Sequence, residues 1–461
     1  MKDRIREILS SVPGEKTIKA EGWVRTKRDS KNVCFLEVND GSVVKGLQVV
    51  IDKASFNNDD LLSQVTTGTA VECSGKLVKS QGGSQAVELA LEDLKIVGTC
   101  PSDYPLQKKR HSIEFLREIA YLRPRTNLIG AVMRVRSTLS YAIHTFFQEN
   151  GFYYVNTPLI TTSDCEGAGE TFQVTTLDLD NVPKTKDGSV DYDKDFFSKK
   201  ASLTVSGQLE GETYALALKN IYTFGPTFRA ENSNTTRHLA EFWMVEPEMA
   251  FCDLEGDEET AEAFLKYIFS YVLEKCPEEM EFFDNFVLKG NIETLRHVID
   301  SPFARMTYTD AIKELEKVNS QFDFPVHWGS DIQTEHEKYL TEVVCKSPVI
   351  VTDYPKEIKA FYMKMNEDGK TVRGMDVLVP RLGEIIGGSE READYDKLLA
   401  RINELGLNPK DYWWYLETRR FGSVPHSGFG LGFERAIQYV TGVANIRDVI
   451  PYPRYVRSAD F

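Results

Sequence analysis

Two side chains of opposite charge stand close together in the middle of the chain, at a spacing that suits nucleotide binding. Arg229 and Glu231 are two residues apart, so on an extended strand they would share one face. A guanidinium can bind a carboxylate and a phosphate together, and a nearby carboxylate can accept a hydrogen bond from an exocyclic amine. Phe242, in the next apolar run, could stack on a base. The alternative is an exposed ion pair that contributes little to stability.

Alternating glycines near the C-terminus could form a second part of such a site. Gly428, Gly430 and Gly432 would leave one surface of a strand flat enough for a planar ring to lie close to the backbone. Arg435, in the helix that follows, could reach a phosphate. The run is not the dinucleotide-binding G-x-G-x-x-G motif, because residue 433 is Phe. A glycine-weakened strand packed against a neighbour is the alternative.

Apolar spacing predicts the elements that must position these residues. Apolar side chains three and four residues apart predict a long helix over residues 126–150, which Gly151 would end. Similar reasoning predicts strands over residues 214–224 and 242–250, and helices over residues 257–275 and 395–405. Because these strands and helices alternate without a βαβ rhythm, we expect an α+β domain on a largely antiparallel sheet with flanking helices.

The N-terminal region has the pattern of a small β-barrel. Short strands are predicted over residues 17–24, 32–38, 46–52, 70–77 and 86–96, with turn signals between them. Five strands in this length suit a Greek-key barrel, of which the OB-fold is the best match. A basic stripe, residues 25–31, accompanies Phe35, which could stack on an unpaired base. The alternative is a barrel that serves only as a spacer or a docking module.

Composition limits the class of protein and at first argues against nucleic acid. The 461 residues carry a formal charge of -15, whereas attraction to phosphate comes from Lys and Arg. The charge is unevenly distributed, however. Residues 104–136 contain eight basic and two acidic side chains, and residues 251–300 contain 13 acidic and four basic ones. We expect binding to nucleic acid on the basic parts, and a solvated helical insertion at residues 251–300.

The sequence favours a cytoplasmic protein with no membrane partner. It contains no uninterrupted apolar stretch of membrane-spanning length and no apolar signal core at its start. Its seven cysteines are scattered, which suits reduced thiols and fits neither a disulfide framework nor a zinc site.

The motifs, taken in order, resemble those of class II aminoacyl-tRNA synthetases. The resemblance rests on the long helix that runs into Pro158, on the Phe228-Arg229-Ala230-Glu231 hairpin, and on the glycine run that ends in Arg435. A preceding OB-fold is similar to the aspartyl, asparaginyl and lysyl subgroup, whose asparaginyl members look closest. The resemblance implies an OB-fold anticodon-binding domain (1–100), a hinge (101–125) and a class II catalytic domain (126–461). It also implies a homodimer built on the long helix and the strand after it.

The family also implies a role for each matched residue in ATP binding. Arg229, Arg435 and Glu384 would be catalytic, with Arg229 bridging the amino-acid carboxylate and the α-phosphate. The nucleotide site would be formed by Arg229, Glu231, Arg237, His238, Phe242, Glu384, Gly432 and Arg435. Glu384 would bind Mg²⁺, with Asp376 as a second carboxylate. In relatives a serine follows three residues after this glutamate, whereas this chain has Gly387.

The predicted amino-acid site favours asparagine over aspartate. It would be formed by Glu170, Ser206, Gln208, Arg229, Glu246 and Arg391. The aspartyl enzymes add a lysine where this chain has Gly211, so a side-chain carboxylate would lack one cation. A neutral amide needs one donor, which Arg391 can supply, and one acceptor, which Glu246 or Glu212 could affect. Glu170 would belong to a loop (166–172) that closes over the amino acid.

The function implied is ATP-dependent ligation of L-asparagine to its tRNA through an asparaginyl-adenylate, with release of AMP and diphosphate. On the barrel, the resemblance assigns Phe35 and Gln48 to the central anticodon base, and Arg25 and Arg28 to the RNA backbone. Three alternatives stay open. They are an aspartyl-tRNA synthetase, an ammonia-dependent ligase similar to asparagine synthetase, which would not need residues 1–100, and a non-catalytic RNA-binding paralogue.

Overall fold

The N-terminal strands close into a five-stranded barrel, as predicted for an OB-fold. The computed structural model describes residues 4–83, 85–109, 111–165 and 170–461. Around the barrel the strand order is β1-β2-β3-β5-β4, with β3 and β5 parallel and the other described pairs antiparallel. The strands are β1 (Gly14–Asp29), β2 (Val33–Asn39), β3 (Leu47–Asp52), β4 (Ala70–Lys79) and β5 (Val87–Gly98). All five predicted strands are confirmed, with ends shifted by a few residues.

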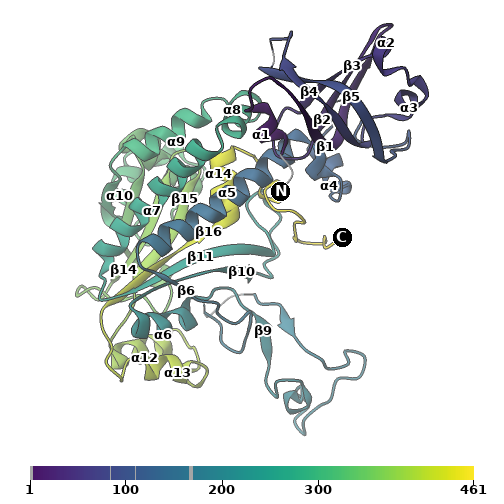
Figure 1. Cartoon of the computed structure of the whole chain (residues 1–461). Coiled ribbons are helices and arrows are strands. Elements are labelled where there is room, and N and C mark those ends of the chain that lie inside the picture. The colour runs from purple at the N-terminus through teal and green to yellow at the C-terminus, as the bar shows by residue number, and fades with distance from the viewer. Residues whose placement is uncertain (1–3, 84, 110, 166–169) are drawn as a thin grey trace. The chain divides into compact units, whose positions relative to one another are not determined.

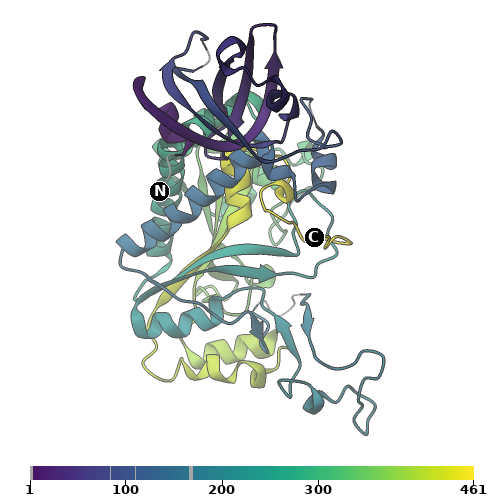
Figure 2. The same cartoon turned by 45° about the vertical axis from the view of Figure 1, so that its right-hand side comes forward.

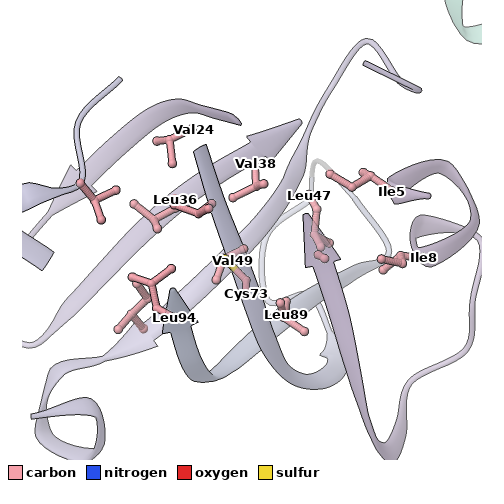
Figure 3. Close-up of a cluster of buried hydrophobic side chains, with 14 of the residues drawn as sticks. Ile5, Ile8, Val24, Leu36, Val38, Leu47, Val49, Cys73, Leu89 and Leu94 are labelled. Carbon is pink, nitrogen blue, oxygen red and sulfur yellow. The ribbon is translucent and has the colours of Figure 1, made fainter. Parts of the chain in front are cut away.

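Alternating side chains fill the inside of this barrel (Figure 3). Leu36 and Val38 of β2, Val49 of β3 and Leu89 of β5 are at most 1% exposed, and they converge on one apolar core. Residues between them face outward, which leaves the outer surface available for polar side chains. Short helices accompany the barrel: α1 (Ile5–Leu9), α2 (Lys53–Phe56), α3 (Asp59–Gln64) and α4 (Ile113–Glu118). Ile5 and Ile8 of α1 belong to the same core.

The C-terminal part is organised around an eight-stranded, largely antiparallel sheet (Figure 1). Its strand order is β12-β13-β14-β15-β16-β11-β10-β6, and among the described strands of this sheet only the edge pairs β12–β13 and β10–β6 are parallel. The strands are β6 (Tyr153–Tyr154), β10 (Asn220–Phe228), β11 (Glu241–Ala250), β12 (Ala304–Thr307), β13 (Val349–Pro355), β14 (Thr371–Val379), β15 (Gly383–Glu390) and β16 (His426–Gly432). The predicted α+β class is therefore confirmed.

Of two predicted elements next to this sheet, a long helix is present and a strand is partly replaced by a helix. The long helix α5 (Asn127–Glu149) is present, and Gly151 follows it with a φ of 79°, the left-handed conformation that suits glycine at a helix end. The strand predicted from residue 214 is wrong in its first half. Helix α6 (Gln208–Leu218) continues to Leu218, and β10 starts only at Asn220. A short apolar run cannot distinguish a buried helix end from a strand.

The acidic region 251–300 is helical, but the prediction of a solvated insertion is wrong. Helix α7 (Leu254–Lys275) contacts β14, β15 and β16 and lies along the sheet (Figure 1). Ala261, Phe264 and Ile268 are completely buried on one face of α7. The apolar spacing that predicts this helix marks its buried face, whereas the net charge of the segment does not. Acidic side chains of α7 also bind a neighbouring strand: Arg305 of β12 forms ion pairs of 2.7 Å and 2.9 Å with Glu258 and Glu262.

The remaining helices surround the sheet, and a small second sheet lies beside it. These helices are α8 (Pro277–Phe286), α9 (Asn291–Asp300), α10 (Tyr308–Glu316), α11 (Thr334–Tyr339), α12 (Tyr395–Glu404), α13 (Trp413–Glu417) and α14 (Phe433–Thr441). The small sheet has the order β7-β9-β8, formed by β7 (Ile160–Thr161), β8 (Gln173–Val174) and β9 (Ala201–Leu203). The chain between β8 and β9 extends away from the large sheet in both views (Figure 2). Among the described helices, none has the length and apolarity needed to cross a membrane.

The contacts divide the chain at residue 135. One unit is Met1–Val135 with Phe461, and the other is Arg136–Asp460. The domain boundaries predicted at residues 100 and 125 stay predictions.

Phe264 offers a test of the role of α7 in the core. Its ring lies 5.2 Å from Phe146, 4.9 Å from Phe147 and 5.9 Å from Phe429, measured between centroids, so it joins α5, α7 and β16. We expect Phe264→Ala to lower the free energy of unfolding by about 3–5 kcal/mol, because it leaves a cavity in a closed core. Phe286→Ala, at a ring that is 75% exposed, should change it by less than about 0.5 kcal/mol. Urea unfolding of both variants makes the comparison; equal losses would contradict this packing.

Candidate active site

Two cavities on the large sheet meet at Arg229 and Glu384. The first, of about 200 Å³, is lined by all eight residues predicted to bind ATP. The second, of about 320 Å³, is lined by five of the six residues predicted to bind the amino acid, together with Asp376. Arg229, Met244, Glu384 and Gly430 belong to the walls of both cavities. A molecule in one cavity can therefore contact a molecule in the other directly beside a guanidinium.

The hairpin formed by β10 and β11 places the aromatic and charged groups of the first cavity. Strand β10 ends at Phe228, so Arg229 and Glu231 do not share a strand face as predicted. The backbone continues extended for one more bond, from the amide of Arg229 to the carbonyl of Ala240 at 3.0 Å. Arg229 then lies over the ring of Phe242, with its guanidinium carbon 5.4 Å from the centroid. The hairpin itself brings the predicted residues together.

The opposite end of this cavity concentrates positive charge. Arg237 and Arg435 are close enough for their charges to repel, and burial together with Arg435 lowers the pKa of Arg237. Arg237 donates a hydrogen bond of 2.8 Å to Thr334, whereas Arg435 lies 3.5 Å from the carboxylate of Glu384. Two guanidinium groups that line the same cavity favour a polyanion such as a triphosphate.

One end of the second cavity is rich in hydrogen-bond acceptors. Glu246 accepts hydrogen bonds from the amide of Gly207 at 3.0 Å and from the hydroxyl of Thr223 at 3.1 Å, and it also bonds to Ser206. The Ser206 hydroxyl in turn accepts a bond of 3.1 Å from the Gln208 amide. Glu246 is only 5% exposed, so its charge can balance a cation such as an α-ammonium group.

At the other end of this cavity, Arg391 is already paired with Glu248. Arg391 donates to both carboxylate oxygens, at 2.6 Å and 3.3 Å, and the two side chains are 3% and 1% exposed. Burial raises the pKa of Glu248, and the charge of Arg391 opposes that effect. Since both oxygens accept bonds from a guanidinium that is always charged, the geometry is that of an ionised pair. This end of the cavity therefore carries almost no net charge.

Glu212, the other acceptor considered from the sequence, does not line this cavity. Its carboxylate bonds to Arg419 at 2.7 Å, to His426 at 3.0 Å and to the hydroxyl of Tyr415 at 2.8 Å. Burial works against its charge, but Arg419 and His426 hold the pKa of Glu212 well below its usual range. It lies 4.0 Å from Arg391 and stabilises that side chain from behind.

Two carboxylates could hold a divalent cation where the cavities meet. A side-chain carbon placed on Gly387 would lie 3.2 Å from an oxygen of Glu384 and 3.6 Å from an oxygen of Asp376, so both point toward one space. Asp376 is also bound by Lys359, at 2.8 Å and 2.9 Å. Among the described residues no group of three or more metal-binding side chains occurs. Two oxygen ligands fit Mg²⁺ that arrives with a nucleotide, because it keeps water and phosphate ligands.

The predicted closing loop falls partly outside the described residues. Residues 166–169 are not described, whereas Glu170 is exposed and its carbonyl accepts a bond of 2.8 Å from the amide of Ala230. This bond ties the end of the loop to the residue after Arg229. Glu170 is not among the residues that line either cavity.

On the barrel, three of the four predicted RNA-binding residues line one cavity of about 340 Å³. Arg28 lies over Phe35, with its guanidinium carbon 5.2 Å from the ring centroid, and donates to Gln48 at 3.3 Å. Arg25 does not line this cavity; it is half-buried, and burial lowers its pKa.

The sequence analysis missed four residues that the fold brings to the site: Glu248, Lys359, Tyr362 and Glu337. Burial and the neighbouring Glu384 raise the pKa of Glu337 to about 7. Of these residues only Glu248 had a local signal, because it lies two residues after Glu246 and thus on the same face of β11. The other three reach the site from segments distant in the sequence.

Comparison with known proteins decides the family. Residues 112–456 match the family described as tRNA synthetases class II (D, K and N), and residues 18–97 match the OB-fold nucleic acid binding domain. The chain belongs to the class II tRNA synthetases of this D, K and N family. The predicted resemblance is therefore confirmed.

The synthetase is similar over its whole length to proteins that act on asparagine. It is 60% identical to the asparagine–tRNA ligase of Synechocystis sp., covering 100% of both chains. It is also 60% identical to that of Treponema denticola, covering 99% of both. Among solved structures, the asparaginyl-tRNA synthetase of Pyrococcus horikoshii complexed with asparaginyl-adenylate superposes with a TM-score of 0.87 at 33% identity, over 100% of this chain and 99% of that one.

Glu337 gives the synthetase a pH dependence that can be tested. In the folded chain the pKa of Glu337 is raised to about 7. At any pH between the ordinary pKa of a glutamate and about 7, the folded state therefore holds a proton that the unfolded state has released. Stability should therefore fall as the pH rises through this interval, by up to about 3 kcal/mol.

We expect Glu337→Gln to remove this part of the pH dependence and to be more stable than the parent chain at pH 8. Urea unfolding at pH 5 and pH 8 measures the effect, with Glu316→Gln at an exposed position as the control. An unchanged difference between the two pH values in Glu337→Gln would contradict the burial of this carboxyl group.

Proposed function

We propose that this synthetase joins L-asparagine to its tRNA, using ATP and passing through an asparaginyl-adenylate, with release of AMP and diphosphate. The observation that carries the proposal is the pairing of Arg391 with Glu248 at the end of the amino-acid cavity. A side-chain carboxylate there would face Glu248 with no free cationic charge to compensate for it. A neutral amide, by contrast, can accept from Arg391 and donate to Glu248. The similarity to asparagine–tRNA ligases supports the same substrate.

The remaining groups fit the two ends of an α-amino acid. Glu246, with Ser206 and Gln208 beside it, would bind the α-ammonium group, since this end of the cavity offers buried acceptors. Arg229 would bind the α-carboxylate from the junction with the nucleotide cavity. Asparagine then spans the cavity from Glu246 to Arg391, with its reacting carboxylate facing the nucleotide.

Adenylate formation needs positioning and charge compensation more than proton transfer. The α-carboxylate attacks the α-phosphate of ATP, the bond to the leaving diphosphate breaks, and no proton is moved. Arg229 can bind both the attacking carboxylate and the α-phosphate, while Arg237 and Arg435 balance the charge of the leaving diphosphate. Phe242 would stack under the adenine ring, with Glu231 accepting from its amine and His238 near the phosphates.

Mg²⁺ is proposed as a partner of ATP, held by Glu384 together with Asp376. Bound there, it would neutralise charge on the phosphate oxygens. Glu384 is the more accessible ligand, since Asp376 is shared with Lys359. Gly387 leaves space for the cation where relatives carry a serine.

The barrel cavity suits recognition of the anticodon. Phe35 offers a ring on which an unpaired base could stack, and Arg28 and Gln48 supply polar groups beside it.

We also propose a cytoplasmic homodimer. The aromatic side chains of Tyr141 and Tyr153 are 64% and 60% exposed on α5 and β6, where the family places its subunit interface.

The central test is pyrophosphate exchange with purified protein. Asparagine should support exchange of pyrophosphate into ATP, and aspartate should support it poorly; exchange with aspartate but not asparagine would contradict the proposal.

Glu248→Gln leaves the charge of Arg391 uncompensated, so we expect the preference for asparagine to fall about 10-fold or more. Glu274→Gln, at an exposed position on α7, is the matched control and should keep the parent's ratio.

Anticodon recognition predicts a separate phenotype. Phe35→Ala should lower the efficiency of tRNA charging about 5- to 100-fold, the loss of one stacked base, without changing pyrophosphate exchange. Val97→Ala, at an exposed apolar position of the barrel, should charge tRNA like the parent. Normal charging by Phe35→Ala would rule out this face of the barrel as the anticodon site.

A further inference from the structure

Lys359 holds the carboxylate that is proposed as the second ligand of the divalent cation. Its ammonium group lies 2.9 Å from one oxygen of Asp376 and 2.8 Å from the other. Both side chains line the amino-acid cavity, and each is 17% exposed. Resting on the proposed function, we infer that Lys359 is a counter-ion that keeps a free divalent cation off Asp376 and gives up this carboxylate when the cation arrives with ATP.

The elements around Lys359 hold its ammonium group in place. Lys359 follows the turn Lys356–Ile358 at the end of β13, and its ammonium group lies 3.9 Å from the ring centroid of Tyr354 on that strand. Tyr354 is 3% exposed, and burial together with the charge of Asp376 raises the pKa of its hydroxyl, so the ring stays neutral. A neutral ring face and a carboxylate both attract a cation. The pair is therefore a fixed part of the cavity wall, unlike an exposed ion pair.

Lys359 binds an oxygen that a divalent cation would use. A side-chain carbon on Gly387 would lie 3.6 Å from Oδ1 of Asp376 and 3.2 Å from Oε1 of Glu384, which marks the space between the two carboxylates. Oδ1 of Asp376 is also one of the two oxygens that accept from Lys359. A cation bound to Oδ1 would share this oxygen with an ammonium group, and two positive charges on one oxygen repel each other strongly.

Glu384, the first ligand, also faces a cation. Arg435 lies 3.5 Å from its carboxylate and donates to its backbone carbonyl at 3.2 Å. Because Arg435 also lines the nucleotide cavity, the phosphates of ATP would attract it away from Glu384. The same phosphates add negative charge that offsets the repulsion between the cation and Lys359. Free metal, by contrast, meets two carboxylates whose charge Lys359 and Arg435 already balance.

The test uses Mn²⁺ as the probe, because it prefers the same oxygen ligands as Mg²⁺ and its paramagnetic resonance signal is lost on binding. In the absence of nucleotide, Lys359→Met should bind Mn²⁺ about 10-fold or more tightly than the parent, because the competing charge is gone. Lys359→Arg keeps the charge and should bind like the parent. So should the matched control Lys356→Met, since Lys356 is paired with Glu404 at 2.7 Å and is not among the residues that line the two cavities.

Two further variants assign the gain in Mn²⁺ affinity to this site. Adding Glu384→Gln to Lys359→Met should remove the gain; a gain that persists would place the ion elsewhere and contradict the inference. Lys359→Gln is a second neutral variant, should Lys359→Met not fold. Its amide can still donate to Asp376, and we expect its affinity for Mn²⁺ to rise at least about 3-fold.

Equal Mn²⁺ affinity of the parent and the neutral variants would overturn the inference and leave the pair of Lys359 and Asp376 a structural contact. Absence of asparagine-dependent pyrophosphate exchange in the parent would instead refute the proposed function, which the Mn²⁺ titration does not measure.

Discussion

The burial of Arg391 is the constraint on which the amino-acid site depends. A guanidinium that is 3% exposed needs partners for its charge and its donors, because an unpaired buried charge is strongly destabilising. Glu248 satisfies two of the donors and Ser389 accepts another at 2.8 Å, while Glu212 lies 4.0 Å behind. Once these partners are in place, the guanidinium presents a directed donor with little net charge. Under the proposed function, that combination would distinguish an amide from a carboxylate.

The same constraint explains part of the glycine run. A side-chain carbon on Gly428 would overlap the carbonyl oxygen of Pro247 and lie 2.6 Å from the carboxylate of Glu248. A larger residue would therefore displace the partner of Arg391. A side-chain carbon on Gly430 would meet only the flexible end of Met244, at 2.8 Å, and one on Gly432 would lie 3.6 Å from Arg435 beside the nucleotide cavity. From the sequence, all three glycines had one interpretation, a flat surface for a ring. In the fold, Gly428 mainly makes room for a buried ion pair.

The sequence predicts those parts of the site whose residues lie close together in the chain. Arg229, Glu231 and Phe242 come together because one hairpin carries them, and Arg435 follows its strand directly. Glu337 and Lys359 could not be found in this way, since α11 and the segment before β14 reach the site only through the folding of the large sheet. The burial of α7 was missed for another reason. Apolar spacing predicts the helix and its buried face, whereas the net charge of the whole segment, which predicts a solvated insertion, does not show which face of a helix is buried.

In both cavities some charged side chains are paired with each other, and other charged side chains remain to bind the substrates. Lys359 is paired with Asp376 and Arg391 with Glu248, which removes both cations from competition for a carboxylate. Arg237 and Arg435 repel one another at the opposite end, where a polyphosphate would separate their charges. Arg229 lies between these regions, where the substrates would meet. Under the proposed function, binding and orientation would therefore be enough for the first step, without a general base.

A structure with a non-hydrolysable asparaginyl-adenylate analogue would test the central claim most directly. The pairing of Arg391 with Glu248 predicts that the amide oxygen of the bound analogue accepts from Arg391 while its nitrogen donates to Glu248, with the ion pair intact. An amide nitrogen turned toward solvent or toward Glu246, with Glu248 out of hydrogen-bond reach, would contradict this account of asparagine selection.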